Sequence, residues 1–198
     1  MTTRQLVLAS ASPARLRVLQ NAGFDPEVVV SGISEDIAAR STDRMVRDLA
    51  VAKAEAVAPL RPQSLVLGCD SMLEVEGRAL GKPKNAGEAL ATWGLLRGAD
   101  HVLFTGHCLV DTASGRRAVG VARTTVRFGQ PDPAELEAYV ATGEPLLTAG
   151  GFTIDGRGAA FVDGVDGDPN NVLGLSVALV RRLLRELGVS LTELWTPT

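Results

Sequence analysis

The chain has 198 residues, of which 45% are hydrophobic and 22% are charged, and its formal net charge is −3. This composition is ordinary for a globular protein, and the length suits one domain with a substantial core. The lack of an apolar run of about 18 residues argues against a membrane segment, and the acidic balance argues against a general nucleic-acid binder.

Two further features predict a cytoplasmic protein. The N-terminus enters a strand pattern directly and lacks the long apolar region of a signal peptide. The two cysteines, Cys69 and Cys108, lie inside apolar runs without partners at metal-ligand spacing, so we expect buried, reduced thiols.

The first element is a strand over residues 6–9, followed by a polar loop and a helix. Ser12 is a suitable N-cap, Pro13 a suitable first helical residue, and Gly23 ends the helix. Free backbone N–H groups at a helix N-terminus attract phosphate, and Ser10, Ser12 and Arg15 would reinforce such a site. The alternative is that Ser12 only caps the helix and Arg15 is solvated.

Residues 26–30 predict a second strand, and Glu35 and Asp36 follow it. These carboxylates either belong to an exposed loop or bind a hard cation such as Mg²⁺. A helix over 43–58 carries Lys53 on its apolar stripe, where an ammonium group is costly unless it is paired or reaches a pocket. The alternative is that Lys53 snorkels at the edge of the stripe.

Residues 64–84 form the most informative stretch. An apolar run over 65–69 predicts a buried strand that ends on Asp70, and Lys82 and Lys84 follow about a dozen residues later. Ligands bind beyond the carboxyl ends of strands in α/β sheets, so Asp70 is expected to face a phosphorylated small molecule. The alternative is a turn-forming Asp. A strand–helix–strand crossover would place Asp70 at the same sheet edge as the 10–15 loop.

The second half predicts a helix over 85–96 with Asn85 as its N-cap, and a hairpin of strands 101–111 and 117–128. It also predicts a helix that Asp132 caps and that runs to about Thr142, and a closing helix over 175–187. A glycine-rich irregular segment lies before the last helix, and such segments are often functional. The sequence contains no P-loop and no GxGxxG after a strand. His101 and His107 lack the pattern of a zinc pair.

Six segments, in order, resemble the Maf-like nucleoside triphosphate pyrophosphatase family: LASASPARLRVL, SLVLGCDSML, LGKPKNAGEAL, HVLFT, GEPLLTAGGFTIDG and DGDPNNVLGLS. The resemblance covers nearly the whole chain. It implies an α/β fold with a mixed, largely parallel twisted sheet, flanking helices and two lobes around a central cleft, in one domain over residues 1–198. It also implies frequent dimers.

The resemblance further implies hydrolysis of a nucleoside triphosphate between the α and β phosphates, with Mg²⁺ or Mn²⁺. Asp70 matches the family's proposed general base, and Glu35 and Asp70 are the expected metal ligands. Lys53 and Lys82 match other active-site positions. The phosphate-binding opening motif corresponds to Ser10, Ser12 and Arg15.

Four residues depart from the family pattern. Ala14 replaces an arginine, Ser71 stands where Thr or Gln is usual, Asp155 replaces a glutamine, and Thr148 replaces a lysine. The first three positions are linked to substrate choice in the family, so the preferred base stays open. Asp155 could accept a hydrogen bond from a base amino group. Two alternative functions remain: a nucleotide-binding regulator of cell division with little turnover, and a nucleotidyl or phosphoryl transferase.

Overall fold

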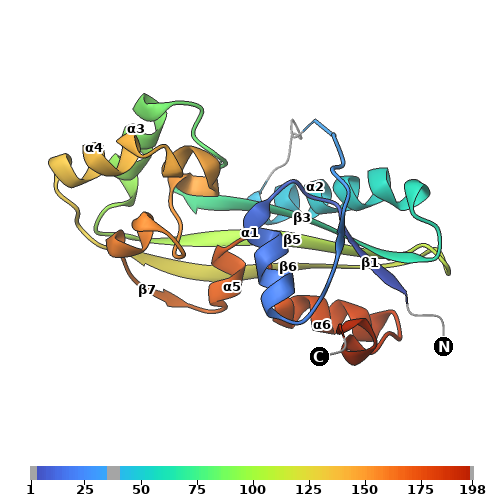
Figure 1. Ribbon diagram of the computed structural model, residues 1–198. Helices are drawn as coiled ribbons and strands as arrows, with labels where there is room; N and C mark the ends of the chain where they lie inside the picture. The colour runs from blue at the N-terminus through green and yellow to red at the C-terminus, as the bar shows by residue number, and fades with distance from the viewer. Residues whose placement is uncertain (1–3, 35–40, 197–198) are drawn as a thin grey trace.

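A computed structural model describes residues 4–34 and 41–196 (Figure 1). Across these residues the chain forms one seven-stranded sheet in the order β2-β1-β3-β5-β6-β7, with β4 also paired to β3. The strands are β1 (Gln5–Leu8), β2 (Glu27–Val28), β3 (Ser64–Val75), β4 (Arg78–Leu80), β5 (Asp100–Asp111), β6 (Arg116–Phe128) and β7 (Val162–Asp166).

The sheet is mixed. β1 pairs in parallel with β2 and β3, whereas the pairs β3–β4, β3–β5, β5–β6 and β6–β7 are antiparallel. The predicted mixed α/β sheet and the predicted hairpin, β5–β6, are confirmed. Within the described chain, parallel pairing joins only the first three strands, which are linked by helical crossovers. Tight turns reverse the chain between β3 and β4 and between β5 and β6, and longer segments that contain helices lead into the antiparallel strands β5 and β7.

Three helices begin at the predicted caps. The side chains of Ser12, Asn85 and Asp132 accept backbone N–H groups of the first turn, and Asp132 forms a full capping box with Glu135. None of the helices in the described ranges has the length and apolar character needed to span a membrane. The α-helices are α1 (Pro13–Asn21), α2 (Thr42–Val57), α3 (Ala86–Leu96), α4 (Pro133–Ala141), α5 (Pro169–Val172) and α6 (Val177–Glu186).

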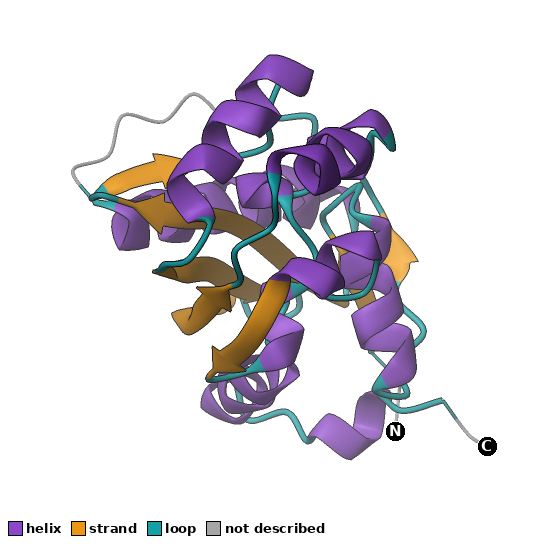
Figure 2. Cartoon of the chain, turned by 90° about the vertical axis from the view of Figure 1, so that its left-hand side faces the viewer, coloured by secondary structure: helices purple, strands orange, loops and turns teal. Residues whose placement is uncertain are grey.

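Helices cover both faces of the sheet, and Figure 1 shows α2 and α6 on opposite sides. One core cluster joins β1 and β3 to α1 and α6, and a second joins β1 and β3 to α2. A third lies at the far end of the long strands, where Trp93 makes edge-to-face contacts with Phe128, Tyr139 and Phe161. Figure 2 shows the helical layers around the sheet from the side.

The strand predicted to end at Asp70 does not end there. β3 continues through Asp70 to Val75, paired with β5 without a break up to Glu74. The strand that stops at this level is β1, whose last paired residue, Leu8, lies opposite Leu67. The change from apolar to polar sequence at Asp70 therefore lies just past the point where β3 loses its parallel neighbour β1 on one edge, and not at the end of β3 itself.

Two glycines allow α2 to lie unusually close to the sheet. A Cβ atom on Gly68 of β3 would lie 2.3 Å from the carbonyl oxygen of Ala50, and one on Gly106 of β5 would lie 2.0 Å from that of Val46. Any side chain at either position would push α2 away. This close packing holds Lys53 of α2 against β3.

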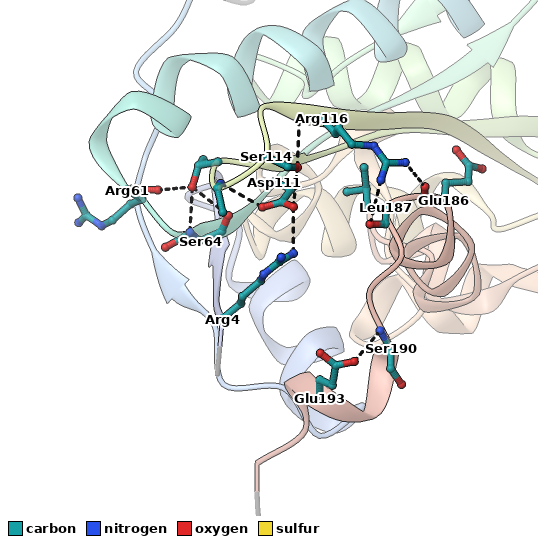
Figure 3. A network of polar contacts seen from close by, with 12 residues as sticks. Arg4, Arg61, Ser64, Asp111, Ser114, Arg116, Glu186, Leu187, Ser190 and Glu193 are labelled. Carbon is teal, nitrogen blue, oxygen red and sulfur yellow. Dashed lines mark hydrogen bonds and ion pairs between the residues drawn. The ribbon is translucent and has the colours of Figure 1, made fainter. Parts of the chain in front are cut away.

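A polar network ties the β5–β6 turn to both ends of the chain (Figure 3). Asp111 is only 2% exposed, pairs with Arg4 at 2.9 Å and accepts the Ser114 hydroxyl at 2.7 Å. Arg116 donates to the carbonyl oxygen of Glu186 at the end of α6. A cation at this position also interacts favourably with the negative end of the helix dipole.

Candidate active site

The candidate active site is a cleft of about 540 Å³ that opens beyond the end of β1. The N–H of Ala9 makes the last contact of this segment with β3, to the carbonyl oxygen of Leu67 at 2.8 Å. β4 joins the same edge of β3 only from Leu73 onward. The middle of β3 therefore faces an opening between two strand ends. The predicted site residues along the described chain all line this cleft: Ser10, Ser12, Ala14, Arg15, Lys53, Asp70, Ser71, Lys82 and Asp155.

The N-terminus of α1 forms one wall of the cleft. The Ser12 hydroxyl accepts the backbone N–H of Arg15 at 3.4 Å, and the Ser10 hydroxyl accepts the backbone N–H of Ser12 at 3.2 Å. α1 has nine residues, so its dipole contributes positive potential at this end. Ser12 is thus both a cap and a cleft residue, and the two predicted roles do not exclude each other.

Arg15 is buried beneath this wall, with 8% exposure. Its Nε donates to the carbonyl oxygen of Gly174 at 2.8 Å, and Nη1 donates to Ser10 Oγ at 3.0 Å and to the Cys69 carbonyl at 2.9 Å. Nη2 donates to Ser71 Oγ at 3.0 Å. Four of the five N–H groups of a guanidinium are thus used within the protein, so Arg15 offers the cleft a positive charge and one donor, not a two-pronged clamp.

Asp70 and Lys53 form a buried ion pair at the floor of the cleft. Their side chains are 6% and 9% exposed, and Lys53 Nζ contacts Asp70 Oδ1 directly. Lys53 therefore follows the prediction that an ammonium group on a core-facing stripe needs a partner. The other oxygen, Asp70 Oδ2, is buried and has no hydrogen-bond partner within the described part of the chain. A buried carboxylate oxygen without a partner is a strong candidate for a ligand contact.

The two lysines that follow β4 differ in position. Lys82 is exposed and lines the cleft. β4 ends at Leu80, and the residue before Lys82, Gly81, lies next to the Met72 side chain of β3, which also lines the cleft. Lys84 is not among the cleft residues, and its backbone N–H donates to Glu88. Lys82 is the lysine placed to meet a charged ligand.

Asp155 lies on the opposite wall and is already engaged. It forms an ion pair with Arg17 of α1 at 2.9 Å and accepts the hydroxyl of Thr153. Partial burial raises the pKa of Asp155, but the hydrogen bonds from Thr153 and Arg17 outweigh it and lower the pKa below the usual value. Asp155 is therefore a carboxylate at neutral pH and remains available as an acceptor.

A divalent cation fits part of this site. Asp70 Oδ2 is the free oxygen that such an ion would take, and Mg²⁺ is typically held by only one or two protein carboxylates. No group of three His, Cys, Asp or Glu side chains that could hold a metal occurs among residues 4–34 and 41–196. The second predicted ligand, Glu35, and its neighbour Asp36 lie outside the described residues.

The buried histidine and cysteines are structural. Burial lowers the pKa of His107 to about 3, so its ring is neutral, and its Nε2 accepts the backbone N–H of Ser176 at 2.9 Å. Cys69 and Cys108 are free and buried, as predicted. Burial raises the pKa of Cys69 to about 12, which keeps the thiol protonated and unreactive.

Three residues around the cleft were not predicted. Arg17 reaches the cleft and pairs with Asp155, and Glu144 lines it while accepting the backbone N–H groups of Arg157 and Gly158. Thr105 lies behind the cleft, opposite Ser71 in the β3–β5 register, with their hydroxyl oxygens 2.9 Å apart. The sequence signals for Thr105 were its place at the end of the HVLFT segment and a hydroxyl within an apolar strand.

These features define a class of protein. It is an α/β protein whose cleft combines a helix N-terminus, cationic side chains and a buried carboxylate, a combination suited to an anionic ligand and to the activation of water. The chain belongs to the Maf-like protein family, whose sequence model matches residues 5–187. The resemblance noted from the sequence is confirmed.

Curated relatives agree in name. A protein of Streptomyces avermitilis named nucleoside triphosphate pyrophosphatase is 56% identical over 98% of this chain and 96% of its own length. One of the same name from Trichormus variabilis is 45% identical over 98% of this chain and all of its own length. Among solved structures, the Staphylococcus aureus Ham1 protein is 17% identical, with a TM-score of 0.42 over 64% of this chain and 72% of that one.

Proposed function

We propose that this protein hydrolyses nucleoside triphosphates between the α and β phosphates and releases a nucleoside monophosphate and pyrophosphate. The observation that carries the proposal is the buried Asp70–Lys53 pair in the same cleft as the N-terminus of α1. The names of the curated relatives support this reaction class. Non-standard or surplus nucleotides are the expected substrates.

The residues divide the work as follows. Ser10, Ser12 and Lys82 bind phosphate oxygens, and Arg15 adds positive charge from below. The carboxylate of Asp70 orients a water molecule and takes its proton as the new P–O bond forms. The anhydride bond breaks at the same centre, and its electron pair leaves on the departing phosphate oxygen.

Lys53 contacts Asp70 directly, compensates its negative charge and fixes its orientation for this step. Asp70 and Glu35 would hold Mg²⁺ or Mn²⁺, which supplies charge neutralisation and Lewis acidity when bound.

We further propose a cytoplasmic location, consistent with the two free cysteines. A homodimer is the proposed assembly, which sedimentation of the purified protein can test directly.

A panel of nucleotides tests the activity. We expect pyrophosphate release that requires a divalent cation, and a loss of about 10²–10⁴-fold in kcat for Asp70→Asn, the usual contribution of a general base. Lys84→Gln is the matched control, because Lys84 lies outside the cleft. A fully active Asp70→Asn enzyme would remove the mechanism. Binding without pyrophosphate release would favour the nucleotide-binding regulator, for which Ala14 and Thr148, in place of the family's basic residues, are the supporting features.

A further inference from the structure

The hydroxyl groups around Arg15 have fixed directions of donation. A guanidinium can only donate hydrogen bonds, so each oxygen that contacts Arg15 is an acceptor in that contact. Ser10 Oγ and Ser71 Oγ both lie 3.0 Å from Arg15 nitrogens. Each serine has one proton left, and the neighbours of each hydroxyl decide where this proton points.

The proton of Ser71 points away from the cleft. Thr105 is fully buried, and its hydroxyl donates to the carbonyl oxygen of Asn171 at 3.4 Å. Either hydroxyl could donate in the 2.9 Å contact between them. Because the Thr105 proton has an acceptor in the Asn171 carbonyl, the contact is assigned as a donation from Ser71 to Thr105. This arrangement satisfies both hydroxyl protons inside the protein. Ser71 therefore presents only a lone pair to a ligand.

Ser10 and Ser12 have the opposite polarity. Ser10 Oγ accepts from Arg15 and from the backbone N–H of Ser12, so both of its lone pairs are used and its proton remains for a ligand. Ser12 accepts the N–H of Arg15 and also keeps its proton. Ionised phosphate oxygens only accept hydrogen bonds, so they suit Ser10 and Ser12 and are repelled by the lone pair of Ser71.

We propose that Thr105 is a positioning residue that makes Ser71 a hydrogen-bond acceptor and so orients the substrate in the cleft. The triphosphate lies toward Ser10 and Ser12, and a donor group of the nucleoside, a base N–H or a ribose hydroxyl, lies at Ser71. This inference rests on the proposed function for the identity of the ligand, and the polarity of the hydroxyls decides its orientation.

The test compares Thr105→Val with Thr105→Ser, using nucleoside triphosphates and inorganic tripolyphosphate as probes. Valine has nearly the same shape but cannot accept the Ser71 proton, while the Asn171 carbonyl keeps its second donor, the N–H of Gly174 at 2.9 Å. We expect Thr105→Val to raise KM for the nucleotide about fivefold to tenfold, the effect of one hydrogen bond. The inhibition constant of tripolyphosphate should stay unchanged, because it reaches only the phosphate side. Thr105→Ser should restore the nucleotide KM.

Two further variants complete the design. Ser71→Ala removes the Ser71 oxygen that would accept a hydrogen bond from the nucleoside and leaves the buried Thr105 in place. It should weaken nucleotide binding but not tripolyphosphate binding, and it serves as the test even if Thr105→Val folds poorly. Ser10→Ala should weaken both probes. Equal weakening of nucleotide and tripolyphosphate by Thr105→Val or Ser71→Ala would overturn the inference. If the wild-type protein released no pyrophosphate, the proposed function would fail, and dissociation constants for the same two probes would still decide the orientation.

Discussion

Replacing Lys53 by methionine tests the buried ion pair on which the proposed chemistry depends. Methionine keeps an unbranched apolar side chain at this position of α2 and removes the ammonium group that contacts Asp70. Both side chains are below 10% exposure, at 9% and 6%. Removing one member of a buried pair leaves a buried charge without compensation and typically costs about 3–5 kcal/mol. We expect Lys53→Met to lower the free energy of unfolding by about 3 kcal/mol.

Urea denaturation at pH 7, followed by circular dichroism, measures this loss. The double variant Lys53→Met/Asp70→Asn has no charge at either position and should recover most of the stability. Arg117→Met is the matched control, because its partner Glu55 also lies on α2 but both side chains are 53% exposed. A loss below about 1 kcal/mol for Lys53→Met, the range of exposed ion pairs, would refute the reasoning.

Asp111→Asn should destabilise the protein by about 1–2 kcal/mol at pH 7. Burial raises the pKa of Asp111, but hydrogen bonds from Ser114 and Ala113 and the charge of Arg4 outweigh it and lower the pKa overall. The Asp111 carboxylate therefore stabilises the folded protein above about pH 4, the usual pKa of an aspartate in the unfolded chain. Thermal unfolding of the wild type and of Asp111→Asn should show the difference in stability disappear at lower pH. Gly106→Ala should cost about 3 kcal/mol and reduce activity by displacing α2, whereas Gly94→Ala, with open space around it, should be harmless in the same assay. If Asp155 accepts a base amino group, pyrophosphate release should be faster from CTP than from UTP, and Asp155→Ala should abolish that difference; equal wild-type rates would dispose of the idea.

Local signals in the sequence were enough for much of the fold. The caps at Ser12, Asn85 and Asp132 depend on contacts within one helical turn, and the β5–β6 hairpin depends on a short turn, so both could be predicted. The apolar stripe of α2 also predicted correctly that Lys53 would need a partner. These features are decided by residues close together in the chain.

The features that could not be predicted depend on strand register and on contacts between segments far apart in the sequence. The Ser71–Thr105 contact exists because β3 and β5 pair in one particular register, and the Arg17–Asp155 pair joins residues 138 positions apart. The continuation of β3 through Asp70 is supported by β5, where the residue paired with Asp70 is Gly106, 36 positions later in the sequence. Neither hydrophobic periodicity nor turn chemistry carries such information. The placement of Glu35 stays a prediction.

The opening between β1 and β4 has a consequence for association between molecules. An exposed strand edge normally offers a template on which another chain can add by backbone pairing. Here β5 covers one edge of β3 throughout, and the other edge lacks a strand partner only over residues 68–72, between the ends of β1 and β4 inside the cleft. Arg15 already occupies the Cys69 carbonyl. The gap between β1 and β4 thus forms the candidate active-site cleft, and it is too short for a strand of another molecule to pair with β3 there.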